Sequence, residues 1–354
     1  MFNSNLYLQD LKQINECNLP WDKLNNKTVL ITGATGLIGS VLVDAFIYRN
    51  EYLNGGIKLL LLGRSEKSIL ERFKNYVDKE YFNYIVQDIE STISTDESID
   101  YIIHAASKGD PKSFAENPIG IMNANYIGTY QVLELARKQK VQKVLFISTG
   151  EVYGIVKKEV GSIDGLKECD YGFMDVLNAR SCYSSSKRAG ETLCAAYYQQ
   201  HKVDFNVARP CHTYGASMQE NDSRVICEFF RKALSKEDIV MKSAGTQIRS
   251  YCYVTDTIKG LLYILLLGVA GEAYNIANKN STITIRELAE KVSQYSQSSV
   301  IYENPSNIEL RGFSNIQHAI LDATKLEELG WSACYNMDDG ITRTLEISRK
   351  NYVR

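Results

Sequence analysis

The sequence has little of several features that mark particular classes of protein. It contains only five prolines in 354 residues and no low-complexity tract or internal repeat, which argues against a long disordered connector. Its 40 Lys and Arg residues nearly balance its 42 Asp and Glu residues, so the formal net charge at pH 7 is only -2. Because there is no basic surplus to hold a polyanion, we expect neither a nucleic acid nor a membrane as a partner.

Long apolar runs and paired cysteines are also missing. The longest apolar stretch, residues 260–271, is too short to span a bilayer. The start of the chain carries Asp10, Lys12 and Glu16 where a secretion signal would be apolar. The eight cysteines lie far apart without a C-x-x-C pair, which predicts neither a disulfide framework nor a zinc site. We therefore expect a cytoplasmic protein with reduced thiols and no metal.

Short apolar runs alternate with amphipathic segments through the first two thirds of the chain. The runs lie at residues 28–32, 57–62, 84–86, 99–103, 144–147 and 205–208. They are nearly continuous rather than alternating, as expected for strands that are covered on both faces. The repeated order of strand and helix predicts an α/β fold with a Rossmann-type, doubly wound parallel sheet.

The pattern changes past about residue 210. Helical stretches at 224–235 and 285–294 and shorter strands at 239–241 and 300–302 predict a smaller mixed α/β domain at the C-terminal end. We expect an N-terminal extension (1–26), an NAD(P)-binding domain (27–209, with a returning part near 250–277) and a substrate-binding domain (210–249 and 278–354). Because no linker separates the two domains, the ligands are expected between them.

Three glycines lie between the first predicted strand and the helix that follows it. Gly33 permits a sharp turn, and Gly36 lets backbone N–H groups approach a pyrophosphate. Gly39 lets the helix and the strand pack closely, with the helix N-terminus facing the negative charge. The pattern predicts a dinucleotide as the ligand.

The end of the second predicted strand carries Arg64 and Ser65, where a carboxylate usually accepts the ribose 2′-hydroxyl group. A guanidinium pairs with a 2′-phosphate, which a carboxylate would repel. We therefore predict that NADP(H) is favoured, with NAD(H) as the alternative. In that alternative, Arg64 is a solvated loop cation.

Tyr183 and Lys187 are four residues apart at the start of a predicted helix, so their side chains share one face. A nearby ammonium and an oxidised nicotinamide both favour the phenolate, which prepares Tyr183 to exchange a proton with a sugar hydroxyl. Thr149 follows another predicted strand and can hydrogen-bond the same reacting oxygen. Together with the glycine turn, these residues predict a redox centre.

The chain resembles an extended short-chain dehydrogenase/reductase of the nucleotide-sugar epimerase and dehydratase family. Besides the motifs above, the resemblance is carried by residues 88–89, 104–107, 125–129, 148–154, 208–210, 249–256 and 329–331, and thus by nearly the whole chain. Residues 209–257 are most similar to UDP-glucuronate decarboxylases and dTDP-glucose 4,6-dehydratases. The resemblance implies a nucleotide-diphosphate-linked sugar as the substrate and a homodimer.

The resemblance also implies roles for individual positions. The cofactor-binding set is Gly33, Thr35, Gly36, Leu37, Ile38, Gly39, Arg64, Ser65, Asp88, Ile89, Ala105, Ala106, Ser107, Asn125, Tyr183, Lys187, Pro210 and His212. The substrate-binding set is Lys108, Glu151, His212, Arg224 and Arg249. The catalytic set is Thr149, Glu151, Tyr183 and Lys187. Within the first set, Asp88 and Ile89 border the adenine, and Asn125 supports the helix that carries Tyr183.

Gly150 departs from the family pattern. In the family that the chain resembles, dTDP-glucose dehydratases have an Asp and Glu pair in this loop, decarboxylases and GDP-mannose dehydratases have a Ser and Glu pair, and plain 4-epimerases typically lack the glutamate. Here Glu151 remains to deprotonate a carbon next to a transient ketone, but its neighbour cannot donate a proton. His212 and Ala216 also replace an asparagine and a proline that are common among relatives.

Three functions stay open. We favour internal redox, in which the cofactor ends as it began, as in epimerases, dehydratases and decarboxylases. The second is an NADPH-dependent net reduction of a nucleotide-linked ketose to a sugar alcohol, which needs no elimination acid and gives a polyol. The third is a non-catalytic module that senses the cofactor, which the intact Thr149, Tyr183 and Lys187 argue against.

Overall fold

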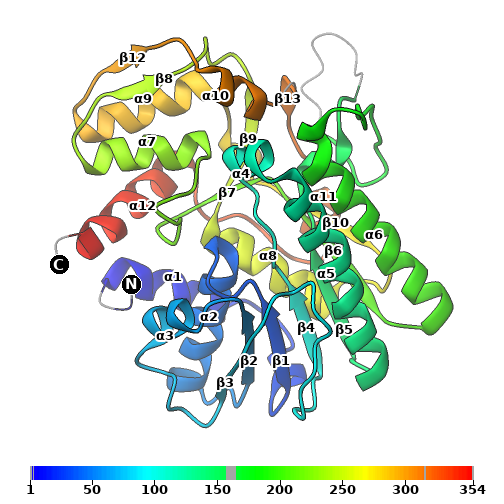
Figure 1. Cartoon of the computed structure of the whole chain (residues 1–354). Helices are drawn as coiled ribbons and strands as arrows, with labels where there is room; N and C mark the ends of the chain where they lie inside the picture. Colours follow the sequence, from blue (N-terminus) through cyan, green and yellow to red (C-terminus); the bar gives the residue numbers. More distant parts are fainter. Residues whose placement is uncertain (1, 3, 157–164, 315, 353–354) are drawn as a thin grey trace.

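A computed structural model describes residues 2, 4–156, 165–314 and 316–352 of the chain. Its largest element is a seven-stranded parallel sheet with the strand order β10-β6-β5-β4-β1-β2-β3 (Figure 1). The strands are β1 (Thr28–Thr32), β2 (Lys58–Gly63), β3 (Phe82–Val86), β4 (Tyr101–His104), β5 (Lys143–Ile147), β6 (Phe205–Pro210) and β10 (Ala273–Ile276). The predicted α/β fold with a doubly wound parallel sheet is confirmed.

Helices cover both faces of this sheet. They are α1 (Asn5–Asn15), α2 (Leu37–Leu53) and α8 (Val254–Leu267) on one face, and α5 (Pro118–Gln139) and α6 (Cys182–His201) on the other (Figure 1). Val29 and Ile31 of β1 pack in the core cluster of the first face, and Leu30 packs in that of the second. This alternation follows from the opposite directions of successive strand side chains. The short helix α3 (Glu66–Phe73) joins β2 to β3.

The sheet grows in two directions from β1. The chain first adds β2 and β3 on one side, then adds β4, β5, β6 and β10 on the other. In sheets of this kind, ligands bind outside the carboxyl ends of the strands where the direction changes. Thr32 at the end of β1 is the register partner of His104 at the end of β4. The turns that follow these two residues therefore border the same space.

A smaller region completes the fold. Its four-stranded sheet contains β7 (His212–Tyr214), β9 (Ile248–Tyr253), β11 (Thr282–Thr284) and β13 (His318–Ala319), and a separate pair contains β8 (Ile239–Met241) and β12 (Val300–Tyr302). Helices α7 (Val225–Leu234), α9 (Ile285–Ser296) and α12 (Met337–Tyr352) pack against one another beside these strands (Figure 1). The remaining short helices are α4 (Pro111–Glu116), α10 (Asn307–Gly312) and α11 (Thr324–Glu327). Helix α4 packs on α10, so the chain that follows β4 contacts this smaller region directly.

The N-terminal segment is packed into the fold. Asp10 on α1 is buried and accepts hydrogen bonds from the hydroxyls of Tyr253 at 2.8 Å and Tyr335 at 3.0 Å. Arg343 on α12 donates to the same carboxylate at 2.8 Å. Burial raises the pKa of Asp10, whereas the contact with Arg343 opposes that change. The segment therefore joins the large sheet's helices to the C-terminal helix.

Several predicted elements have the expected bounds, and others were missed. Strands β8 and β12 coincide with the predicted ranges, whereas α5 begins seven residues before the predicted 125. Helix α1 and the short strands β7, β9, β11 and β13 were not predicted from the sequence. Two- to six-residue strands in a mixed sheet give too short a pattern for periodicity to detect. Within the described parts of the chain, no helix combines the length and apolarity needed to cross a bilayer.

Candidate active site

The glycine turn after β1 is shaped by close backbone contacts. Gly33 has a φ of +66°, which disfavours other residues, and a Cβ there would lie 2.7 Å from the carbonyl oxygen of Ala105. A Cβ on Gly39 would overlap the carbonyl oxygen of Gly33. These contacts bring the turn after β1 against the turn after β4 and let α2 begin close to β1.

The N-terminus of α2 fits a negatively charged ligand. Gly36 occupies the N-cap position and provides no side chain to accept from the first-turn N–H groups, and no acidic residue lies in that turn. Helix N-termini of this kind bind phosphate groups through unpaired N–H groups. Leu37, Ile38 and Gly39 form the first turn, and Thr35 precedes the N-cap. The turn therefore fits the pyrophosphate of a dinucleotide.

Other predicted cofactor residues follow the neighbouring strands. Arg64 is exposed directly after β2, and the Ser65 hydroxyl accepts from the N–H of Ser68 at 3.2 Å to cap α3. The remaining predicted positions are Asp88 and Ile89 after β3, Ala105, Ala106 and Ser107 after β4, and Pro210 at the end of β6. The buried Ser107 Oγ has no hydrogen-bond partner in the part of the chain that the structure describes, which is consistent with a ligand-facing group.

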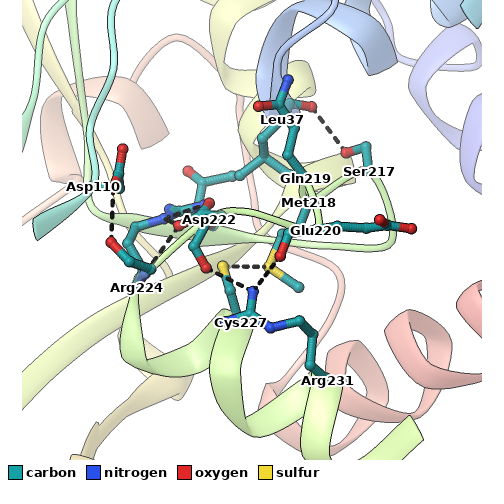
Figure 2. Close-up of polar contacts among 12 residues, drawn as sticks. Leu37, Asp110, Ser217, Met218, Gln219, Glu220, Asp222, Arg224, Cys227 and Arg231 are labelled. Carbon is teal, nitrogen blue, oxygen red and sulfur yellow. Dashed lines mark hydrogen bonds and ion pairs between the residues drawn. The ribbon is translucent and has the colours of Figure 1, made fainter. Parts of the chain in front are cut away.

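Residues 217–223, which we call the clasp, connect β7 to α7 and reach the glycine turn. Ser217 Oγ donates to the carbonyl oxygen of Leu37 at 2.9 Å (Figure 2). Gln219 Nε2 donates to the carbonyl oxygen of Thr35 at 3.3 Å. Two side chains from the smaller region thus hold the segment on which the pyrophosphate is expected to lie.

The clasp is also held in place at the end that leads into α7. Arg231 on α7 donates to the carbonyl oxygens of Glu220 at 3.0 Å and Asp222 at 2.7 Å. Ser223 Oγ donates to Asp110 at 2.7 Å, next to the start of α4 (Figure 2). The clasp therefore connects the glycine turn with the segment after β4 and with α7.

Tyr183 lies in the first turn of α6. Its ring stacks on Phe114 of α4 with ring centroids 4.9 Å apart, and a Cβ on Gly109 would lie 3.4 Å from its hydroxyl. Burial and the charge of Glu151 raise the pKa of Tyr183 to about 12, whereas a hydrogen bond with Thr149 lowers it. Within the chain alone, the net direction is opposite to the lowering that we expected from the sequence.

Lys187 follows Tyr183 by one turn of α6 and is 2% exposed. Its Nζ donates to the carbonyl oxygen of Ile147 at 2.7 Å and lies 4.8 Å from the ring centroid of Phe146. Burial lowers the pKa of Lys187 to about 7, so the ammonium and the neutral amine are both accessible near neutral pH. Asn125 supports this helix from α5, because its Nδ2 donates to Ser186 Oγ at 2.9 Å.

Glu151 is held by two side chains near Tyr183. Arg180 contacts both carboxylate oxygens of Glu151, from Nη1 to Oε2 at 3.1 Å and from Nη2 to Oε1 at 3.3 Å. Ser184 Oγ donates to Oε2 at 3.1 Å. These contacts hold the pKa of Glu151 below its ordinary value, although burial opposes them. Glu151 is therefore a carboxylate near neutral pH.

The two predicted substrate arginines are engaged within the chain. Arg224 forms a two-pronged pair with Asp222, from Nη2 to Oδ2 at 2.7 Å and from Nε to Oδ1 at 3.1 Å. Arg249 donates from Nη2 to the carbonyl oxygen of Ile316 at 2.7 Å and from Nη1 to that of Gln317 at 3.0 Å. Their positions are thus fixed, and their roles toward a substrate stay predictions.

His212 lies at the start of β7, near these charges. Burial and the charges of Arg249 and Arg224 lower the pKa of His212 to about 4, while Glu151 acts in the opposite direction. The ring is therefore neutral near pH 7, and its buried Nδ1 has no hydrogen-bond partner among the described residues. Lys108, the remaining predicted substrate residue, is exposed after β4.

Several residues of this site were not found from the sequence. Arg180 precedes Tyr183 by three residues in a short 3-10 turn, and nothing in its neighbourhood indicates that it pairs with Glu151. Ser217 and Gln219 lie in a loop without periodicity. Among the missed residues, only Asp222 had a signal, because it lies two residues from the predicted Arg224 with which it pairs.

Comparisons with known proteins found a matching family and several similar chains. A family model described as the NAD dependent epimerase/dehydratase family matches residues 29–277. UDP-glucuronic acid decarboxylase 5 of Arabidopsis thaliana is 31% identical over 322 residues, which are 90% of this chain and 88% of that protein. UDP-glucuronic acid decarboxylase 1 of Xenopus tropicalis is 29% identical over 340 residues, which are 92% and 73% of the two chains.

Solved structures share the fold at lower identity. UDP-glucose 4-epimerase of Thermotoga maritima, solved with UDP-glucose, has a TM-score of 0.78 and 22% identity, and covers 92% of this chain and 99% of its own. A dTDP-glucose 4,6-dehydratase of Streptomyces venezuelae, solved with NAD bound, has a TM-score of 0.79 and 22% identity over 92% and 98% of the two chains.

Proposed function

Since the chain belongs to the NAD dependent epimerase/dehydratase family, we propose that it oxidises a hydroxyl of a nucleotide-diphosphate-linked sugar transiently and returns the hydride within the same turnover. The observation that carries this proposal is the joint placement of Thr149, Tyr183 and Lys187 at the sheet edge that also holds the glycine turn. The names of the relatives, which are decarboxylases, epimerases and dehydratases of nucleotide sugars, support the substrate class.

Individual residues have separate roles in the proposed reaction. The backbone N–H groups after Gly36 hold the pyrophosphate, and the bound dinucleotide supplies a hydride acceptor and a positive charge near the phenol. Tyr183, as its phenolate, takes the proton of the sugar hydroxyl, and Thr149 stabilises that phenolate by a hydrogen bond. Lys187 fixes the start of α6 through Ile147 and places a titratable amine one turn from Tyr183.

We propose decarboxylation of a nucleotide-linked uronic acid as the first reaction to test. Its support is the 31% identity to UDP-glucuronic acid decarboxylase 5 over 90% of the chain. Once the sugar carries a ketone, loss of carbon dioxide from the adjacent carbon needs no acid to expel a hydroxyl. The absence of a donor side chain at Gly150 is consistent with that chemistry.

The test follows the sugar and the cofactor together. Pure enzyme is incubated with UDP-glucuronic acid and with neutral UDP-, dTDP-, GDP- and CDP-linked sugars, with added NAD or NADPH. Loss of carbon dioxide, loss of water or isomerisation, each without net change in cofactor absorbance, supports internal redox. Stoichiometric consumption of NADPH with formation of a polyol contradicts it and supports net reduction, with which Gly150 is compatible and for which Arg64 suggests NADPH as the cofactor.

The cofactor preference is a second proposal. Arg64 is exposed directly after β2, which ends at Gly63 rather than at a carboxylate, and this supports a preference for NADP(H). Calorimetry with NAD and NADP on the wild type, Arg64→Gln and the control Lys74→Gln, which changes an exposed lysine at the C-terminal end of α3, decides it. We expect Arg64→Gln alone to weaken NADP binding; tighter NAD binding by the wild type contradicts the preference.

We also propose a homodimer through α5 and α6. Helix α5 exposes Ile119, Met122, Tyr126 and Tyr130, which are 73%, 45%, 47% and 44% exposed and lie three or four residues apart. An apolar stripe of this kind is typical of a covered interface. Sedimentation should give a dimer for the wild type and a monomer for Tyr126→Lys, whereas a monomeric wild type would contradict the proposal.

A further inference from the structure

Arg180 is the side chain through which the Glu151 carboxylate is most fully constrained. It contacts both oxygens of Glu151, and the side chains of Arg180 and Glu151 are only 15% and 24% exposed. Two-pronged arginine–carboxylate contacts fix direction as well as charge. Ser184 adds a third donor to Oε2 at 3.1 Å. These three donors fix the orientation of the Glu151 carboxylate.

Arg180 also contacts Phe114, the residue whose ring stacks on Tyr183. Its guanidinium is 4.5 Å from the ring centroid of Phe114, and Phe114 stacks on Tyr183 at 4.9 Å. Arg180 therefore takes part both in the ion pair with Glu151 and in the contact with the stacked rings of Phe114 and Tyr183. A displacement of Arg180 is expected to move Glu151 first and the Tyr183 ring second, because Arg180 bonds Glu151 directly and reaches the Tyr183 ring through Phe114.

We propose that Arg180 is a positioning residue that keeps Glu151 ionised and aimed, so that Glu151 removes a proton from carbon rather than supplying one to a leaving hydroxyl. This inference rests on the proposed function, for a reaction that breaks a C–H bond next to the transient ketone; a decarboxylation forms the same enolate by loss of carbon dioxide and needs no such base. The site then has a base at Glu151 but no acid beside it, because Gly150 has no side chain to donate a proton.

The proton transfer balances within the site. Glu151 takes the proton from the carbon next to the transient ketone, and the electron pair of that C–H bond becomes an enolate on the ketone oxygen. The proton returns to carbon from Glu151 or, after exchange, from solvent. Pairing with Arg180 makes Glu151 a weaker base, since base strength falls with pKa, but keeps it fully ionised above that pKa.

The test compares Arg180→Gln, Arg180→Lys and Ser184→Ala with the wild type. Turnover of the accepted nucleotide sugar is measured against pH, and the protonation of Glu151 is followed by infrared titration of the cofactor-loaded enzyme without sugar. The carboxyl band is assigned by its loss in Glu151→Gln. Arg349→Gln, which removes a partly exposed arginine paired with Glu346 on α12, is the matched control.

In Arg180→Gln, we expect the acid limb of the kcat profile and the infrared titration to move together to higher pH by roughly one to three units. Arg180→Lys and Ser184→Ala should each give a smaller shift than Arg180→Gln, and Arg349→Gln should give none. KM should change little, because Arg180 contacts Glu151 rather than the sugar.

Two results would overturn the inference. One is an infrared titration of Glu151 that does not move in Arg180→Gln. The other is an increased KM with an unmoved acid limb, which would assign Arg180 to substrate binding. The infrared titration needs no turnover, so it decides the role of Arg180 even if no nucleotide sugar is consumed. Failure to consume any such sugar would count against the proposed function instead.

Discussion

The glycine turn after β1 and the Thr149 loop after β5 lie at the same edge of the large sheet, but they are built in different ways. The glycine turn binds through backbone geometry, with a φ of +66° at Gly33 and an uncapped helix N-terminus at Gly36. The Thr149 loop works through side chains, and its carboxylate at Glu151 is paired with Arg180. We expect the first region to recognise a shape common to all dinucleotides and the second to set the charge of individual reacting groups.

This difference indicates where the chemistry can change during evolution. A substitution in the glycine turn meets backbone atoms, as a Cβ on Gly33 would meet Ala105, and so damages binding of the cofactor outright. A substitution in the Thr149 loop or in its partners changes a pKa or removes a donor while the fold stays intact. Gly150 is a change of the second kind.

The largest expected effect on turnover comes from removing the phenol oxygen of Tyr183, next to the Thr149 loop. Tyr183→Phe keeps the ring that stacks on Phe114 but loses the oxygen that contacts Thr149. We expect kcat to fall by roughly 10²- to 10⁴-fold, because a general acid–base group is lost. Cofactor affinity, measured by calorimetry, should stay close to that of the wild type. Near-normal turnover would contradict the role of Tyr183.

The glycine turn and the pair of Tyr183 and Lys187 could be predicted from the sequence because each is local. Their residues are at most six positions apart, and the spacing alone places them on one turn or one helix face. The partner of Glu151 could not be predicted in this way. Arg180 is 29 positions away and meets Glu151 only through the packing of α6 against the turn after β5.

The same difference between local patterns and long-range contacts applies to the fold. The large sheet was predictable from its long, continuous apolar runs, whereas β7 and β13 are three and two residues long and are defined by pairing with β9. Helix α1 was missed because its buried Asp10 reads as a solvated charge. The partners that compensate this carboxylate, Tyr253 and Arg343, lie more than 240 positions away.

The pH dependence of stability shows whether Lys187 on α6 is charged in the folded chain. The pKa of Lys187 in the folded chain is about 7, below the ordinary 10.5, so the unfolded chain holds an extra proton between these pH values. The cost of burying the ammonium is fully present below pH 7 and is lost as the pH rises toward 10.5. Stability should therefore rise across this window by up to about 1.4 kcal/mol per pH unit.

Urea unfolding of the cofactor-free wild type and of Lys187→Met at a series of pH values checks this slope. The free energy of unfolding of the wild type minus that of the variant should rise between pH 7 and 10.5, because the variant lacks the titrating amine. The lost contact with Ile147 shifts the difference by a constant and leaves the slope unchanged. A flat difference would mean that Lys187 stays charged in the folded chain.

The smallest expected effect lies at the contact between the clasp and the glycine turn. Ser217→Ala removes the clasp's hydrogen bond to the carbonyl oxygen of Leu37 without touching the N–H groups that face the pyrophosphate. Loss of one such bond corresponds to a roughly 2- to 10-fold faster release of the cofactor, measured by stopped-flow displacement. Ser296→Ala, which removes a serine that donates to a backbone carbonyl on α9, should leave release unchanged. Faster release in Ser217→Ala alone would show that retention of the cofactor depends on the clasp as well as on the glycine turn, as an enzyme that reuses its cofactor within each turnover requires.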